Sequence, residues 1–317
     1  MTITFGPVPS RRLGRSLGIN NIPPKSCSYS CLYCQVGATQ GKLIEPRKFY
    51  SPEVIYQEVI AQVKNATSRG ESIDYLTFVP DGEPTLDINL GMAIELLRPL
   101  NIPIAVITNA SLLWREDVRS VIGKADWVSV KVDSVVEEIW KRINRPHKEL
   151  RLDNIMDGIR QFAKQFHGEL VAETMLLEGI NDTQNSVAGV ADFLHEVGVS
   201  KSYLSIPTRP TAESGIVRPS EVALNDAYHI LDNRLPYVEY LIGYEGDAFA
   251  FTGDVQQDLL SITAVHPMRE SAVRDLLVRA KADWSLVEEM MAEGKLKQVD
   301  YLGKHFIVRC FAVQSKA

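Results

Sequence analysis

The sequence predicts an α/β protein made of successive β-α units, followed by a smaller α+β domain at its carboxyl end. Two observations support this fold class. Between residues 15 and 207, short apolar runs typical of strands alternate with segments whose apolar residues recur at helical spacing. Residues 255–317 then change to three short helix-like segments and two strands with alternating apolar residues.

Six strand-like segments are separated by helix-like segments. The predicted strands are residues 15–20, 73–80, 102–109, 126–133, 169–177 and 202–207, and the predicted helices are residues 51–66, 86–100, 113–123, 151–166 and 183–197. Repeated β-α units require parallel strands joined by right-handed crossovers. A doubly wound open sheet meets this requirement, and so does a full or partial barrel. In each of these folds, side chains at the carboxyl ends of the strands form the functional site.

The carboxyl-terminal part of the chain predicts a winged-helix-like domain. Residues 236–254 read as a connecting strand and linker, and residues 255–317 as three helices followed by a β-hairpin. The third helix, "DWSLVEEMMAEG", carries four acidic residues and no basic one, so it would repel the phosphates of a nucleic acid. We therefore favour a protein-contact, dimerisation or lid role, while three lysines in the hairpin keep nucleic-acid binding as an alternative.

The composition indicates a soluble protein of a reducing compartment. Of the 317 residues, 45% are hydrophobic, which is enough for a large core. The chain has no run of 18 apolar residues and no signal-like amino terminus. Because three of the four cysteines are clustered, they do not resemble a disulfide framework. We expect a cytoplasmic protein that does not insert into a membrane, and the oligomeric state is not predicted.

Charge is distributed unevenly along the chain. Residues 1–50 contain seven Lys or Arg and one acidic residue, although the whole protein has a net charge of -6. Two explanations are equally favoured: a polyanionic partner, or compensation for the negative charge of a metal cluster bound by thiolates.

The spacing Cys27-x3-Cys31-x2-Cys34 places three thiol side chains on one short loop after the first predicted strand. A zinc site is the simplest interpretation, but structural zinc takes four ligands. The fourth cysteine, Cys310, lies in the last predicted strand and reads as a buried structural residue. Three thiolates suit a [4Fe-4S] cluster with one iron left open for another ligand.

This motif, with Tyr33 directly before the last cysteine, resembles the radical S-adenosylmethionine (SAM) superfamily. The resemblance covers residues 1–235 and implies a partial (β/α)6 barrel of the TIM type. It also implies a [4Fe-4S] cluster, SAM bound to the open iron, and an external electron donor of the flavodoxin or ferredoxin type. Reductive cleavage of SAM would give a 5'-deoxyadenosyl radical that takes a hydrogen atom from a substrate.

The resemblance extends to residues that would contact SAM. "DGEPT" is similar to the glycine-rich element that meets the methionine ammonium, which carries over to Gly82 and Glu83, with Asp81 in place of the first glycine. "ITNAS" places Thr108 and Asn109 at the end of a strand, where the superfamily binds the ribose or carboxylate. Plain turns of the Asp-Gly and Asn types are the alternatives.

Strand 126–133 alternates polar and apolar residues. Ser129, Lys131 and Asp133 share one face, and three valines share the other. In a barrel the polar face would line the lumen, and buried charges there need partners. Ser129 is thus a candidate cofactor contact, and Lys131 and Asp133 are candidate catalytic residues; an edge strand with one wet face is the alternative.

Two further segments add candidates to the lumen. Glu173 on strand 169–177 is a third candidate catalytic residue if its side chain points inward. Thr208 and Arg209 follow the sixth strand and would lie near the mouth of the site. There Arg209 would bind a carboxylate or phosphate, and an exposed surface arginine is the equally favoured alternative.

Several segments most resemble the branch that contains the wyosine-forming tRNA synthases. This chain lacks the extra cysteines of their second cluster, which leaves the substrate open. An RNA base, a peptide or protein side chain, and a small metabolite are the three candidate substrates. A non-catalytic iron–sulfur sensor that binds DNA is the alternative of a different class.

Overall fold

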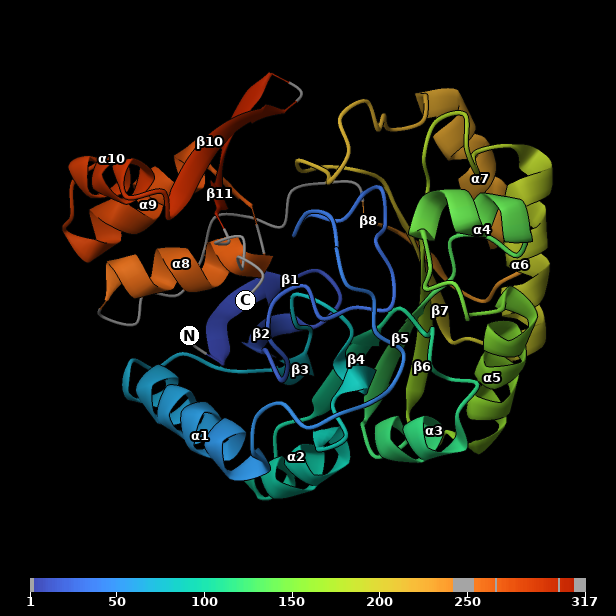
Figure 1. The fold of residues 1–317 in the computed structure, drawn as a ribbon, viewed down its shortest axis with the longest axis horizontal. Helices are drawn as coiled ribbons and strands as arrows, with labels where there is room; N and C mark the ends of the chain where they lie inside the picture. Colours follow the sequence, from blue (N-terminus) through green and yellow to red (C-terminus); the bar gives the residue numbers. More distant parts are fainter. Residues whose placement is uncertain (1–2, 242–253, 266, 302, 311–317) are drawn as a thin grey trace.

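The structure, a computed structural model, describes residues 3–241, 254–265, 267–301 and 303–310. Its main sheet has eight strands in the order β1 to β8. Strands β1 and β2 are antiparallel, and from β2 to β8 each neighbouring pair is parallel. The sheet curls into a partial barrel, with helices along its outer side (Figure 1). The strands are β1 Thr4–Ser10, β2 Gly14–Ile19, β3 Tyr75–Phe78, β4 Ile104–Thr108, β5 Trp127–Lys131, β6 Glu169–Met175, β7 Lys201–Ser205 and β8 Val238–Leu241.

Seven helices accompany the strands of the barrel in the described part of the chain. They are α1 Pro52–Ser68, α2 Leu90–Leu97, α3 Glu116–Ile122, α4 Glu137–Asn144, α5 Leu152–Gln165, α6 Gln184–Val197 and α7 Glu221–Asp232, with short 3-10 turns at Pro84–Leu86 and Arg98–Leu100. The Ser51 side chain caps the amino end of α1 and Pro52 occupies its first turn. Gly198, with a φ of 75°, ends α6 in the left-handed conformation that glycine adopts readily.

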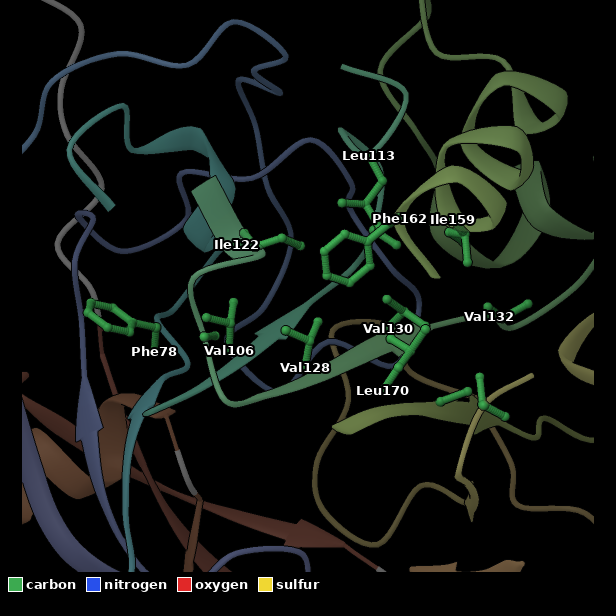
Figure 2. Close-up of a cluster of buried hydrophobic side chains, with 14 of the residues drawn as sticks. Phe78, Val106, Leu113, Ile122, Val128, Val130, Val132, Ile159, Phe162 and Leu170 are labelled. Carbon is green, nitrogen blue, oxygen red and sulfur yellow. The ribbon is translucent and has the colours of Figure 1, made fainter. Parts of the chain in front are cut away.

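The alternation predicted for β5 is present. Val128, Val130 and Val132 are at most 5% exposed and pack in one apolar cluster with Ile159 and Phe162 of α5 (Figure 2). The opposite face points into the barrel, so each strand separates a helix-facing core from the lumen. A second apolar cluster closes one end of the lumen. It contains Leu13, Ala105, Trp127, Val171, Tyr203 and Leu241.

Two strands differ from the six-strand prediction. β1 contains Pro7 and Pro9, which are tolerated because β1 is the edge of the sheet, and which hid the strand in the sequence. The segment Val238–Leu241, which the sequence assigned to a connection outside the barrel, pairs in parallel with β7 as β8. Residues 242–253 of that predicted connection lie outside the described residues.

The carboxyl-terminal part forms its own small domain beside β1 (Figure 1). Helices α8 Val255–Val265, α9 Glu270–Ala280 and α10 Ser285–Ala292 pack against a three-stranded antiparallel sheet of β9 Met268–Arg269, β10 Leu296–Tyr301 and β11 Lys304–Arg309. Val8 of β1 packs against the core of this domain. The helix and hairpin content agrees with the sequence expectation, and assignment to the winged-helix class stays a prediction. Among the described residues, no helix is long and apolar enough to span a bilayer.

Candidate functional site

The three clustered cysteines lie on the long loop between β2 and α1, at the carboxyl ends of the parallel strands. Cys27, Cys31 and Cys34 are half-buried and form no disulfide. The loop is fixed to the end of α4, because the backbone N–H of Ser30 donates to the carbonyl of Asn144 (3.0 Å). A tight turn follows, in which the N–H of Cys34 donates to the carbonyl of Cys31 (3.1 Å). The side chains are therefore held in place by backbone contacts.

Two amide side chains reach the cysteine sulfurs from neighbouring elements. Asn109 Nδ2, after β4, donates to Cys27 Sγ at 3.5 Å. Asn144 Nδ2, at the end of α4, donates to Cys31 Sγ at 3.4 Å. Hydrogen bonds to ligand sulfurs tune the reduction potential of an iron–sulfur cluster. Asn109 was a sequence candidate. Asn144 was missed, because an Asn at a helix end reads as an ordinary terminating residue.

The thiols fit a cluster better than a single ion. Burial raises the pKa of Cys31 to about 12 and also raises the pKa of Cys27 and Cys34, so stable thiolates here need a bound cation. Within the described parts of the chain, no three His, Cys, Asp or Glu side chains lie together as ligands of one metal ion. In a [4Fe-4S] cluster each cysteine binds a different iron, so the sulfurs need not converge on one point.

The segment "DGEPT" follows β3 and passes directly beneath the cysteine loop. A Cβ atom on Gly82 would lie 2.0 Å from the backbone oxygen of Ser26, so this approach requires glycine. The N–H of Glu83 donates to the same oxygen at 2.9 Å, and the N–H of Lys25 donates to the carbonyl of Asp81 at 2.7 Å. The predicted neighbourhood of the two motifs is therefore a direct backbone contact.

Glu83 is fully buried and both of its carboxylate oxygens are hydrogen-bonded. Oε1 accepts from the hydroxyls of Thr85 and Thr108, each at 2.6 Å, and from the N–H of Thr85 at 3.1 Å. Oε2 accepts from the N–H of Asn109 at 2.7 Å. Burial raises the pKa of Glu83 and these bonds oppose the rise. Glu83 thus fixes the ends of β3 and β4 against each other below the cysteine loop.

Asp81, which stands where the superfamily element has a glycine, faces the carboxyl-terminal domain. Its side chain is 3% exposed, and its Oδ1 has no hydrogen-bond partner. Burial raises the pKa of Asp81 to about 8, although the charges of Arg309 on β11 and of Lys25 oppose this rise. The site is therefore electrostatically linked to the second domain through this carboxyl group.

Asp133, a predicted lumen residue, connects β5 to the cysteine loop. Its Oδ2 accepts a hydrogen bond from the Tyr33 hydroxyl and one from Asn144 Nδ2 at 2.7 Å. Its Oδ1 accepts from the N–H of Met175 at 2.9 Å. Tyr33 is itself buried, and Lys131 Nζ lies 5.0 Å from the centre of its ring. Asp133 and Tyr33 therefore hold the loop over the barrel.

Lys131 and Glu173 meet inside the barrel as the alternation of β5 and β6 predicted. Lys131 Nζ and Glu173 Oε1 are 2.7 Å apart, and the Ser205 hydroxyl donates to the same oxygen at 3.0 Å. The guanidinium of Arg12, from the turn between β1 and β2, pairs with Glu173 Oε2. The sequence did not predict Arg12 as a site residue, since it is 161 positions away from Glu173.

Neighbouring opposite charges, rather than burial, decide the direction in which the pKa values of Lys131 and Glu173 shift. Burial alone would raise the pKa of Glu173, but Lys131 and Arg12 outweigh it and lower that pKa to about 2. Burial would likewise lower the pKa of Lys131, and the carboxylates of Glu173 and Asp133 raise it instead. Both groups are charged at neutral pH.

A cavity of about 250 Å³ lies next to this ion pair and extends to the cysteine loop. Its polar lining comes from both ends of the sheet and includes Ser10, Arg11, Arg12, Ser16, Gln35, Thr77, Glu173, Ser205, Thr208 and Arg209. Thr208 and Arg209 line it as expected for residues after β7, and Arg209 donates to Gln35 Oε1 at 3.3 Å. Ser129 is buried on the lumen-facing side of β5 but is not among the residues that line the cavity.

Comparison with known proteins agrees with this arrangement. Residues 21–193, more than half of the chain, match the family model described as the radical SAM superfamily. The chain is 49% identical to a UPF0026 protein of Methanocaldococcus jannaschii, over 98% of this chain and 96% of that protein.

Solved structures with the same fold are more distant in sequence. A radical SAM methyltransferase from Sphaerobacter thermophilus superposes with a TM-score of 0.53 at 18% identity, over 71% of this chain and 66% of that one. A TYW1 structure with a lysine-pyruvate adduct bound superposes with a TM-score of 0.51 at 18% identity, over 70% and 74%. These two likenesses concern the fold.

Proposed function

Because the chain belongs to the radical SAM superfamily, we propose that it is an enzyme that cleaves SAM reductively at a [4Fe-4S] cluster held by Cys27, Cys31 and Cys34. When bound, the cluster and SAM together supply a 5'-deoxyadenosyl radical, with the electron coming from an external donor of the flavodoxin or ferredoxin type. The observation that carries the proposal is the set of three clustered cysteines above the strand ends, with the fourth cysteine of the chain, Cys310, in the other domain.

The residues around the cysteine loop divide into those that would hold SAM and those that hold the loop. Gly82 and Asn109 lie beside Cys27 and are proposed to bind SAM, with Ser129 on the lumen face below them. Thr108 and Glu83 would support this contact through their mutual hydrogen bond. Tyr33 is proposed to act mainly by fixing the loop, because its hydroxyl is bonded to Asp133.

The charged residues of the lumen are proposed to handle the substrate. Lys131 stays protonated beside Glu173, so it offers a cation and hydrogen-bond donors, and a neutral amine nucleophile is not available there. Glu173 holds both cations in place, Lys131 at its Oε1 atom and Arg12 at its Oε2 atom. Asp133 is proposed as a positioning residue, since the bonds to its carboxylate come from Tyr33, Asn144 and a backbone N–H.

The barrel also shields a radical from water. The apolar cluster of Leu13, Trp127 and Tyr203 closes one end of the lumen. The cysteine loop covers the other end through its contacts with α4. Exclusion of water prevents side reactions of a reactive intermediate.

A DNA-binding iron–sulfur sensor is less well supported. Glu288, Glu289 and Glu293 on and after α10 are exposed, so the predicted reading helix presents negative charge to solvent. Such a face repels the phosphates that supply most of the binding energy for nucleic acid. A protein-contact or lid role remains the proposal for this domain.

The test is formation of 5'-deoxyadenosine. Reconstituted wild-type protein is reduced, incubated with SAM and examined by chromatography, together with Cys31→Ala and a matched control, Cys310→Ala. Cys310 lies in the other domain, just after β11, and its N–H donates to the carbonyl of Lys295. We expect product from wild type and Cys310→Ala, and none from Cys31→Ala. Equal product from both variants, or none from wild type, would refute the proposal.

A further inference from the structure

The basic residues of the β1–β2 hairpin point in different directions. Arg15 faces outward, where its guanidinium pairs with Glu71 at 3.3 Å and its side chain is 41% exposed. Arg12 and Arg11, three and four residues earlier, instead line the internal cavity. Part of the amino-terminal positive charge is therefore directed into the lumen, which favours a small ligand over a nucleic acid bound across the surface.

The charged lining of the cavity is unbalanced. Among the described residues that line it, the guanidinium groups of Arg11 and Arg12 accompany one carboxylate, that of Glu173. This carboxylate is also paired with Lys131, so its negative charge is shared between two cations. Buried positive charge without a counter-charge is costly in a medium of low dielectric constant. An anion in the cavity would balance it.

Hydrogen-bond donors of the same arginines are also unsatisfied. The Nε atoms of Arg11 and Arg12 are buried and have no hydrogen-bond partner. The rest of each guanidinium is held in place, since Arg11 donates from Nη1 to the carbonyl of Tyr240 (3.4 Å) and Arg12 pairs with Glu173. Buried donors in native proteins are nearly always paired, and guanidinium groups bind carboxylate and phosphate through two parallel bonds.

From these observations we infer that the substrate carries a phosphate or carboxylate group, which Arg11 and Arg12 bind inside the barrel. The inference rests on the proposed function only in naming this anion as part of the substrate; the binding site itself does not depend on radical chemistry. The cavity of about 250 Å³ suits a small compound, since pockets for larger, drug-sized ligands are typically about 300–1,000 Å³. The class is therefore a small phosphorylated or carboxylated metabolite.

The experiment is calorimetric titration of the reconstituted full-length protein with two probes, inorganic phosphate and malonate, at constant ionic strength set with chloride. Arg11→Gln is compared with Arg15→Gln, which removes an equal charge from the same hairpin but outside the cavity. We expect one probe to bind wild type and Arg15→Gln equally, and Arg11→Gln at least about tenfold more weakly, as for loss of a charge-assisted hydrogen bond. The probe that binds more tightly identifies the group as phosphate or carboxylate.

Other outcomes overturn the inference. Equal affinity in Arg11→Gln and wild type, or binding of neither probe, excludes the anion site. If a short mixed-sequence RNA binds while both probes do not, the ligand is a nucleic acid. Should Arg11→Gln fail to fold by circular dichroism, Arg12→Gln is titrated instead, with the same expectation. Absence of 5'-deoxyadenosine from wild type would refute the proposed function alone, because probe binding is measured without SAM.

Discussion

The β3–β4 side of the lumen and the β6–β7 side differ in how their buried charges are satisfied. On the first side, the oxygens of Glu83 accept four hydrogen bonds from Thr85, Thr108 and Asn109. On the second side, Glu173 is shared by two cations, and the Nε donors of Arg11 and Arg12, which reach it from the β1–β2 turn, lack partners. A network in which every buried polar atom has a hydrogen-bond partner is rigid, and it suits the binding of one unvarying cofactor. A network with unpaired buried donors is suited to binding a ligand, because the ligand can accept those hydrogen bonds.

Replacing Glu173 by Gln should have the largest effect on stability, because it leaves Lys131 and Arg12 together without the carboxylate that pairs with both. We expect a loss of about 3–5 kcal/mol in the free energy of unfolding, as when one partner of a buried ion pair is removed. Chemical denaturation monitored by circular dichroism measures it. A loss below about 1 kcal/mol, the value typical of a surface pair, would contradict the described burial of this network.

The pH dependence of the same variant sharpens this prediction. Glu173 has a pKa of about 2 in the folded protein, below the usual 4.5. Its contribution is therefore complete above about pH 4.5 and is lost as the pH falls toward 2. The difference in stability between wild type and Glu173→Gln should shrink over that range. A constant difference would mean that the ion pair is not its cause.

Gly82→Ala tests the rigid side at its closest backbone contact. The added Cβ would lie 2.0 Å from the carbonyl oxygen of Ser26, one residue before Cys27. Since backbone atoms on both sides must move, we expect a cost of about 1–3 kcal/mol and reduced iron content after reconstitution. Gly41→Ala, where no atom lies within 4 Å of the added Cβ, is the control. Full iron content in Gly82→Ala would show that the contact is not needed.

Glu83→Gln tests whether the satisfied network depends on a carboxylate. The Gln amide cannot accept the bonds of both Thr108 and the Asn109 N–H, so one buried donor loses its partner. We expect destabilisation of about 1.5–3 kcal/mol, in the range for hydrogen bonds to charged groups. Thermal unfolding measures it, and Glu53→Gln on the exposed face of α1 provides the control. Destabilisation no larger than in that control would contradict the account.

Asp81→Asn should change stability in the opposite direction. In the folded protein Asp81 has a pKa of about 8, against an ordinary value of 3.8, so the folded state retains a proton that the unfolded state has lost. Wild-type stability contributed by this group therefore falls as the pH rises from about 4 to 8. We expect the stability of Asp81→Asn to rise relative to wild type by about 1.4 kcal/mol for each pH unit between about pH 5 and pH 8, measured by chemical denaturation. No change of this difference with pH would refute it.

Much of the site could be predicted because its residues lie at the ends of parallel strands. The cysteine loop, "DGEPT" and "ITNAS" each follow a strand, and such ends meet at one edge of a sheet. Alternation along β5 and β6 likewise predicted that Lys131 and Glu173 share the lumen, although it also placed Asp133 there without indicating its bond to Tyr33.

The remaining features depend on contacts between distant parts of the chain. Arg11 and Arg12 enter the lumen because the β1–β2 hairpin folds against β8, and two prolines conceal β1 in the sequence. Asn144 reaches Cys31 only through the packing of α4 on the cysteine loop. Local periodicity carries no signal for such pairs, which are set by tertiary packing.

The central claim, that three cysteines hold a cluster with one iron open to SAM, is tested most directly by electron paramagnetic resonance. The reduced, reconstituted protein is examined before and after addition of SAM. We predict the signal of a reduced [4Fe-4S] cluster whose g-values shift when SAM binds to its open iron, and loss of that signal in Cys31→Ala. A cluster signal that SAM leaves unchanged, or the same signal in Cys31→Ala, would contradict the account.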